Sequence, residues 1–173
     1  MAVAGSPPQS PELFGVKLKG ATRNQLQQAL KAGGMKPTSV GDNAWTDTYD
    51  SSGVLQGSSE FHIGYVRKTG TFAIARYTFN GFMDTGLVTK VARMVASKYG
   101  PPSVHQGNDS LGEVTYRWNL PEGMAIRVER GWPDTTTYLN FDDPAAIAAM
   151  TAEWAVARNR AEREEAKAQS KAF

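Results

Sequence analysis

The sequence predicts an α+β protein in which two α-β-β-β units form an antiparallel sheet packed under two helices, with a further helix at the C-terminal end. A helical pattern followed by three segments of alternating apolar and polar residues occurs twice, in residues 13–80 and again in 81–142. A third helical pattern occupies residues 143–173. Two such units can share one sheet because each buries the same face of its strands under its helix.

Composition narrows the function classes. The chain has 173 residues, of which 40% are hydrophobic, as is usual for a globular protein of one domain. It contains no cysteine, which excludes disulfides, thiolate catalysis and cysteine-ligated metal sites. The longest apolar runs are far shorter than the roughly 18 residues of a transmembrane helix. The net charge is +2 without a clustered basic stripe, so we do not expect a nucleic-acid partner.

The N-terminal segment 1–12 is rich in Pro, Gly and Ser and has no periodicity, so we expect it to be disordered. It lacks the basic region and the apolar stretch of a signal peptide. Ala-Val-Ala followed by Pro and Ser is nevertheless typical of exported chains whose signal peptide has been removed. These residues favour a periplasmic or secreted protein, and a cytoplasmic protein is the alternative.

The first unit begins with a short extended segment, 13–18. Thr22 and Gln25 have the spacing of a capping box, and the pattern predicts a helix over 22–32 that ends at Gly33-Gly34. Three strands follow in each unit. Their inward residues are predicted to be Trp45, Asp47 and Tyr49; Phe61, Ile63 and Tyr65; those of 72–79; Tyr116, Trp118 and Leu120; Met124, Ile126 and Val128; and Thr137, Leu139 and Phe141.

The helix of the second unit is predicted to begin at a cap formed by Asp84 or Thr85 and to end at Tyr99-Gly100-Pro101. Its predicted apolar face consists of Leu87, Val91, Met94 and Val95. The last helix is predicted to begin with Asp143 as its cap and Pro144 in its first turn. Its seam consists of Ile147, Met150, Trp154, Ala157 and Ala161. We expect this seam to pack on the sheet of the same chain, with dimerisation through the helix as the alternative, and the charged end beyond residue 158 to fray or project.

The segment FGVKLKGATRNQLQQALKAGG (residues 14–34) and the later Tyr99-Gly100-Pro101 with the Tyr116/Trp118 strand resemble the tandem helix–sheet repeat of two domain families. These are the β-lactamase-inhibitor-protein-like domains and the BamE-like (SmpA/OmlA) domains. The resemblance covers residues 13–142 in the order of elements. It implies a secreted or periplasmic non-enzyme that binds another protein. Because the lipidation cysteine and the disulfide cysteines of those families are absent here, no functional residue carries over.

The outward face of the second unit is the candidate binding surface. Arg and Tyr are favoured at interfaces, and neighbouring residues on one sheet face lie about 5 Å apart. A solvated face with paired charges such as Arg127 and Glu129 is the alternative. The candidate partner-binding residues are Arg117, Asn119, Arg127, Glu129, Trp132, Tyr138 and Asn140.

Catalytic and metal-binding patterns are weak. His62 lies two residues after Glu60 on one strand face, near Asp47 and Asp50 in the neighbouring strand, and His105 lies in a loop with Asp109 and Ser110. No G-x-S-x-G elbow or phosphate-binding glycine motif occurs. We therefore predict a non-catalytic protein-binding or inhibitor-type module without cofactor or metal. The alternatives are a cytoplasmic immunity or accessory protein that occludes a partner, and a small hydrolase that uses His62 or His105.

Overall fold

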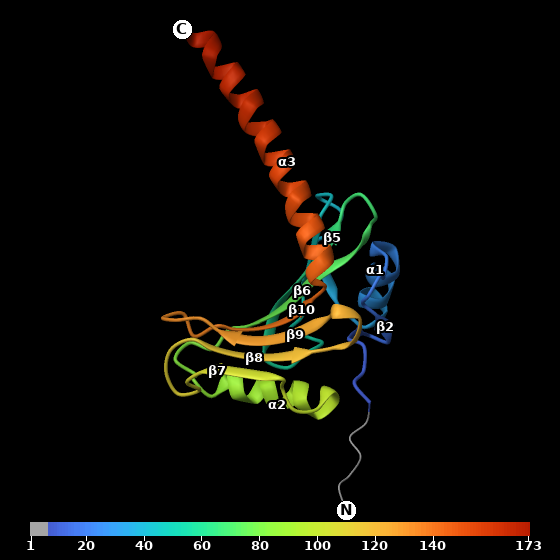
Figure 1. Cartoon of the computed structure of the whole chain (residues 1–173), viewed down its shortest axis with the longest axis vertical. Helices are drawn as coiled ribbons and strands as arrows, with labels where there is room; N and C mark the ends of the chain where they lie inside the picture. The colour runs from blue at the N-terminus through green and yellow to red at the C-terminus, as the bar shows by residue number, and fades with distance from the viewer. Residues whose placement is uncertain (1–6) are drawn as a thin grey trace, which may run out of the picture.

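The structure, a computed structural model, describes residues 7–173. Its centre is an eight-stranded antiparallel sheet with the order β3-β4-β5-β6-β10-β9-β8-β7 (Figure 1). The strands are β3 (Lys36–Ser39), β4 (Thr46–Asp50), β5 (Ser58–Val66), β6 (Thr71–Phe79), β7 (Val104–Gly107), β8 (Val114–Asn119), β9 (Ala125–Arg130) and β10 (Thr137–Asp142). A separate two-stranded hairpin consists of β1 (Glu12–Leu13) and β2 (Val16–Lys17). Pro11, within the segment expected to be disordered, is buried, and residues 1–6 lie outside the described residues.

The α+β class, the antiparallel sheet and the C-terminal helix are confirmed. The two meanders join through β6 and β10, where Thr137 pairs with Phe79 and Asp142 with Ile74. Each half contains four strands, so the prediction of three per unit missed β3 and β7. Both are edge strands whose residues are almost all exposed, and therefore neither shows the alternation on which the prediction depended.

Helix α1 (Arg23–Ala32) begins as predicted. The Thr22 hydroxyl accepts from the N–H of Gln25, and the Gln25 side chain accepts from the N–H of Thr22. The chain leaves the helix through Gly34, whose φ of +90° lies in the left-handed region that favours glycine. Leu26 and Leu30 are buried in the main core.

Helix α2 (Leu87–Tyr99) ends at Gly100 as predicted, but its start and its buried face differ from the prediction. Its N-cap is Gly86, whose N–H donates to the Asp84 carboxylate. Asp84 therefore closes a turn before the helix and does not cap it. Met94 is 38% exposed. The buried face is turned by a few tens of degrees from the predicted one and consists of Val88, Val91, Ala92 and Val95.

The main core lies between one face of the sheet and the helices α1 and α2. The alternating strand residues face it as predicted, among them Phe61, Trp118 and Ile126, none more than 1% exposed. Tyr49 and the fully buried Asp47 lie in β4, whereas Trp45 precedes the strand and packs in a second cluster. We call the other face of the sheet, opposite α1 and α2, the outward face.

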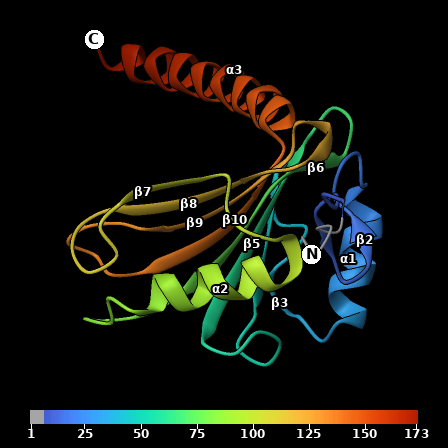
Figure 2. The same cartoon turned by 60° about the horizontal axis from the view of Figure 1, so that its bottom comes forward.

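Helix α3 (Pro144–Gln169) packs on the outward face, so that the sheet lies between α3 and α2 (Figure 2). Asp143 caps it by accepting from the N–H of Ala146, and Pro144 is its first residue, both as predicted. Met150 is buried against Val66 and Ala73 in the second cluster. From residue 158 onward every residue is exposed, and this half projects from the sheet (Figure 1).

Candidate functional site

Three loops gather at one end of the second half of the sheet. They are residues 80–86 between β6 and α2, 108–113 between β7 and β8, and 131–136 between β9 and β10. The strand register brings them together, since Phe79 pairs with Thr137, Thr137 with Arg130, and Arg130 with Val114. We call these three loops the loop end; they lie at the left of Figure 2.

A buried guanidinium fixes the first two loops. Arg130, the last residue of β9, is 1% exposed and donates to four backbone carbonyls. These belong to Thr85 at 2.7 Å in the first loop, and to Asn108, Asp109 and Gly112 at 2.8–3.1 Å in the second. No carboxylate lies within ion-pair distance of Arg130 among the described residues. Every hydrogen bond from the Arg130 guanidinium therefore goes to a backbone carbonyl, which ties the two loops to the end of β9.

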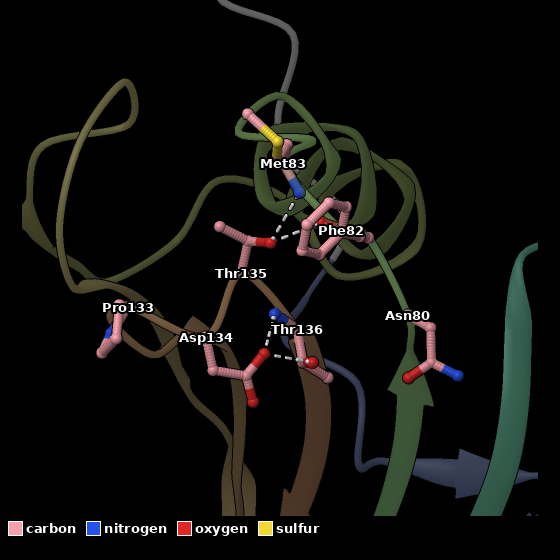
Figure 3. A pocket seen from close by; sticks show the side chains of 8 residues that line it. Asn80, Phe82, Met83, Pro133, Asp134, Thr135 and Thr136 are labelled. Atoms are coloured by element: carbon pink, nitrogen blue, oxygen red, sulfur yellow. Dashed lines mark hydrogen bonds between the residues drawn. The ribbon is translucent and has the colours of Figure 1, made fainter.

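The third loop is joined to the first through Thr135. Its hydroxyl donates to the carbonyl of Gly81 at 2.6 Å and accepts from the N–H of Met83 at 3.0 Å (Figure 3). Asp134 closes its own turn by accepting from the backbone and hydroxyl of Thr136. A cavity of about 390 Å³ lies between the first and third loops. The first and third loops are therefore held by hydrogen bonds to one another.

Large apolar side chains on these hydrogen-bonded loops face solvent. Phe82 is 92% exposed and Met83 77%, and Trp132 and Leu111 are also exposed. Hydrophobic residues exposed together at one end of a protein commonly mark a contact with another molecule. Of the candidate partner-binding residues named from the sequence, Trp132 alone belongs to the loop end.

The loop end is also acidic. Its three loops contain Asp84, Asp109, Glu113 and Asp134 and no Lys or Arg. Tyr116 donates to Asp109 at 2.6 Å, and His105 lies 2.9 Å from the same carboxylate. These two contacts lower the pKa of Asp109 against the opposing effect of its partial burial. The carboxylate is therefore ionised at neutral pH, and the surface combines negative charge with exposed apolar groups.

The predicted sheet-face residues form a network with one another. Arg127 donates to Asp142 at 2.5 Å and to Glu129 at 2.8 Å. Asn140, which is fully buried, donates to Glu129 at 3.1 Å. Burial alone would lower the pKa of Arg127, but the two carboxylates outweigh it and raise that pKa.

Sequence reasoning missed two members of this network. Arg76 comes from the other half of the sheet; its Nε donates to Asn140 at 2.7 Å, and its guanidinium lies 4.6 Å from the ring centroid of Tyr138. Asp142 was not among the candidate residues, although it lies two residues after Asn140 on the same strand and bonds Arg127. The pairing of β6 with β10, which a sequence pattern does not give, places Arg76 opposite Asn140. We call these six residues the sheet-face network: Arg76, Arg127, Glu129, Tyr138, Asn140 and Asp142.

Arg117 and Asn119 lie on the same face but outside this network. The Nε of Arg117 donates to Asn119 at 2.9 Å, and no carboxylate pairs with Arg117 among residues 7–173. The register places Arg117 directly opposite Arg127. Like charges at such a position destabilise a sheet slightly.

Neither histidine lies beside a serine nucleophile. His105 stacks on Tyr116 with ring centroids 4.3 Å apart, and its hydrogen-bond partner is Asp109 and not Ser110. His62 contacts the Glu60 carboxylate and lies 3.2 Å from the Thr48 hydroxyl.

Of the two proposed neighbours of His62, Asp50 is on the same side of β4 as Thr48 but accepts from Ser52. Asp47 faces the main core, where it pairs with Arg23, and so it is not beside His62. In the part of the chain that the structure describes, no three His, Asp or Glu side chains gather as a metal site. Over the same residues, no helix is both long and apolar enough to cross a membrane.

Comparisons with known proteins give no functional identity. No protein-family model matches the chain, and no curated protein matches it. Among solved structures, the chain is similar to the DUF4309 family protein YjgB from Bacillus subtilis, with 20% identity and a TM-score of 0.44. The match covers 78% of this chain and 85% of that one. Likeness at this level supports no argument about function, so the function is argued from the site alone.

Proposed function

We propose that the protein is a non-catalytic binding or inhibitor-type module that contacts another folded protein through its loop end. The observation that carries this proposal is the exposure of Phe82, Met83, Leu111 and Trp132 on loops whose backbones are held by Arg130 and Thr135. Loops whose backbones are already held lose little conformational entropy on binding. Most of the free energy gained by burying their exposed apolar side chains therefore remains as binding affinity. Trp is also among the residues most enriched at the centres of interfaces.

The charge of the loop end indicates the chemistry of the partner. Four carboxylates and no Lys or Arg disfavour an anionic membrane or a nucleic acid, both of which attract basic surfaces. They favour a protein with an apolar recess bordered by Lys or Arg. Phe82 and Trp132 would enter that recess, and Asp84 and Asp134 would face its basic border.

Site-specific crosslinking tests this proposal. A photoreactive phenylalanine replaces Phe82 in one variant and Val156, an exposed apolar residue of α3, in the matched control. Each is irradiated in extract of the source organism. We expect one specific protein adduct from position 82, weakened at high salt, and none of that mass from position 156.

Competition with unlabelled protein shows whether the adduct is specific. Excess wild-type protein should abolish the adduct, and the double variant Phe82→Ser, Trp132→Ser should compete at least about tenfold less well, the loss expected when two interface anchors are removed. Equal competition by the wild type and the double variant, or the same adduct from both positions, would contradict the proposal. Because both side chains are exposed, the double variant should keep the stability of the wild type.

A further inference from the structure

A second cavity, separate from the loop end, lies where α3 meets the outward face of the sheet. Its volume is about 460 Å³, within the range of about 300–1,000 Å³ that small-molecule sites occupy. Ile74 of β6 forms part of the sheet wall, and Ile147, Met150 and Trp154 form the wall on α3. Trp154 is 43% exposed beside these apolar groups, so a ligand in the cavity would cover apolar surface that now faces water.

The cavity depends on a glycine. A Cβ at Gly64 would lie 2.9 Å from Cγ2 of Ile74 and 3.1 Å from Sδ of Met150. The missing side chain therefore allows α3 to approach β5 at Met150. Beyond this contact α3 diverges from the sheet, and Trp154 lies on the next turn of the helix (Figure 2).

Two ionisable side chains, His62 and Arg76, line the cavity and are cross-strand neighbours. The ring nitrogens of His62 are occupied by Glu60 and Thr48. Arg76 differs, because its Nε alone has a hydrogen-bond partner among the described residues, the amide oxygen of Asn140. Its two terminal nitrogens keep donors for a ligand.

The surrounding network gives those donors one ion pair, with Glu129, but no hydrogen bond among the described residues. Glu129, the nearest carboxylate, lies 3.6 Å from Nη2 of Arg76 and is already bonded by Arg127 at 2.8 Å and Asn140 at 3.1 Å. Asp142 is held by Arg127. Both carboxylates of the network are thus engaged by the other arginine, and the Tyr138 ring holds the Arg76 guanidinium in place at 4.6 Å.

We propose that this cavity binds an amphipathic carboxylate. The apolar body of the ligand packs between Ile74, Met150 and Trp154, and its carboxylate accepts from the terminal nitrogens of Arg76. A planar guanidinium whose terminal nitrogens make no hydrogen bond among the described residues matches a carboxylate better than a neutral head group. The apolar body of the ligand could be an alkyl chain or an aromatic ring, and the test distinguishes these two kinds of body.

Calorimetric titration of the full chain tests this site with decanoate, indole-3-propionate and, as the neutral control, decanol. We expect saturable binding of at least one acid and weaker binding of decanol. Arg76→Gln should weaken acid binding about tenfold or more, as expected for the loss of a charged hydrogen bond, and leave decanol binding unchanged. Arg117→Gln, on the same face but outside the cavity, is the matched control and should bind like the wild type.

A second variant fills the space without touching the polar network. Thr151 is exposed on α3 and lines the cavity, so Thr151→Phe should abolish binding of every probe while the thermal midpoint stays unchanged. Three results would overturn the proposal: no acid binds up to millimolar concentration, acid binding survives Thr151→Phe, or Arg76→Gln weakens the acid and decanol equally. The acid that binds more tightly identifies the body as alkyl or aromatic.

Discussion

The two halves of the sheet have the same topology but opposite surroundings on the outward face. In the half formed by β3–β6, the apolar Val66, Ala73 and Ile74 pack with Met150 of α3, although His62 and Arg76 lie on the same face beside them. In the half formed by β7–β10, Arg117, Arg127 and Glu129 occupy the equivalent positions, and none of the described helices covers them. The difference shows that the outward residues, and not the sheet topology, decide where a third layer forms, because a helix can bury apolar groups but not charges.

The halves also differ in how one arginine holds each together. In the first half, Arg23 pairs with the buried Asp47 at 2.5 Å and also donates to the carbonyls of Asn43 and Ala44. In the second half, Arg130 bonds only backbone carbonyls. The first arrangement depends on an ionised carboxylate bonded to the arginine and is therefore sensitive to acid, whereas Arg130 forms no hydrogen bond to a group that titrates in that range.

The largest expected effect comes from breaking the ion pair of the first half. Asp47→Asn should cost about 3–5 kcal/mol in the free energy of unfolding at pH 7, because Arg23 would lose its counter-ion. Urea denaturation measures this. A cost below about 1 kcal/mol would mean that the carbonyls of Asn43 and Ala44 suffice for Arg23.

The same substitution should change the pH dependence of stability. Burial raises the pKa of Asp47, but hydrogen bonds from Arg23, Gly41 and Gln27 outweigh it and lower the pKa below that of the unfolded chain, about 3.9. A lowered native pKa gives stability that is present above the unfolded value and is lost as the pH falls through the native one. Unfolding free energies between pH 5 and 2 should therefore decline less steeply in Asp47→Asn than in the wild type, and equal slopes would contradict this assignment.

Arg130→Met tests the second half. It should lower the free energy of unfolding by about 3 kcal/mol, because several partly buried carbonyls would lose their hydrogen-bond donor. This loss should be the same at pH 7 and pH 4, unlike that of Asp47→Asn. Hydrogen exchange should rise in residues 108–113. Arg130→Lys serves as the control and should recover part of the loss, since it restores a charge and up to three donors.

Gly64→Val should lower the free energy of unfolding by about 2 kcal/mol, because the added carbons overlap Ile74 and Met150. The strain should appear where α3 meets the sheet, so limited proteolysis should cut α3 sooner than in the wild type. Unchanged stability and unchanged cleavage would show that α3 is not held at Gly64.

The smallest effect is expected on the open half. Arg117→Thr should change the free energy of unfolding by no more than about 0.5 kcal/mol, and in the stabilising direction, because it removes a charge opposite Arg127. Adding salt should reduce the difference. A marked destabilisation would show that Arg117 has a structural partner beyond Asn119.

Much of the fold was predictable because it depends on local chemistry. The capping box at Thr22, the stop at Gly100, the Asp143 cap and the alternation in β5, β8, β9 and β10 each arise from residues close in sequence. The edge strands β3 and β7 were missed because hydrogen bonding to a neighbour creates them. The candidate site was predictable only in part. Its residues on β8–β10 share one face, as alternation predicts. Arg76 is placed beside them by the pairing of β6 with β10, and the loops 80–86 and 108–113 are joined by Arg130, so both depend on contacts between distant parts of the chain.

By itself the sequence determined the α+β class, the helices and which phase of most strands is buried, because side-chain alternation and end-capping act over a few residues. The tertiary structure alone decided that β6 pairs with β10, that α3 covers only one half of the outward face, and that Arg130 joins separate loops. These three features depend on contacts between residues far apart in the sequence. A pattern over a few neighbouring residues does not specify which distant segments meet.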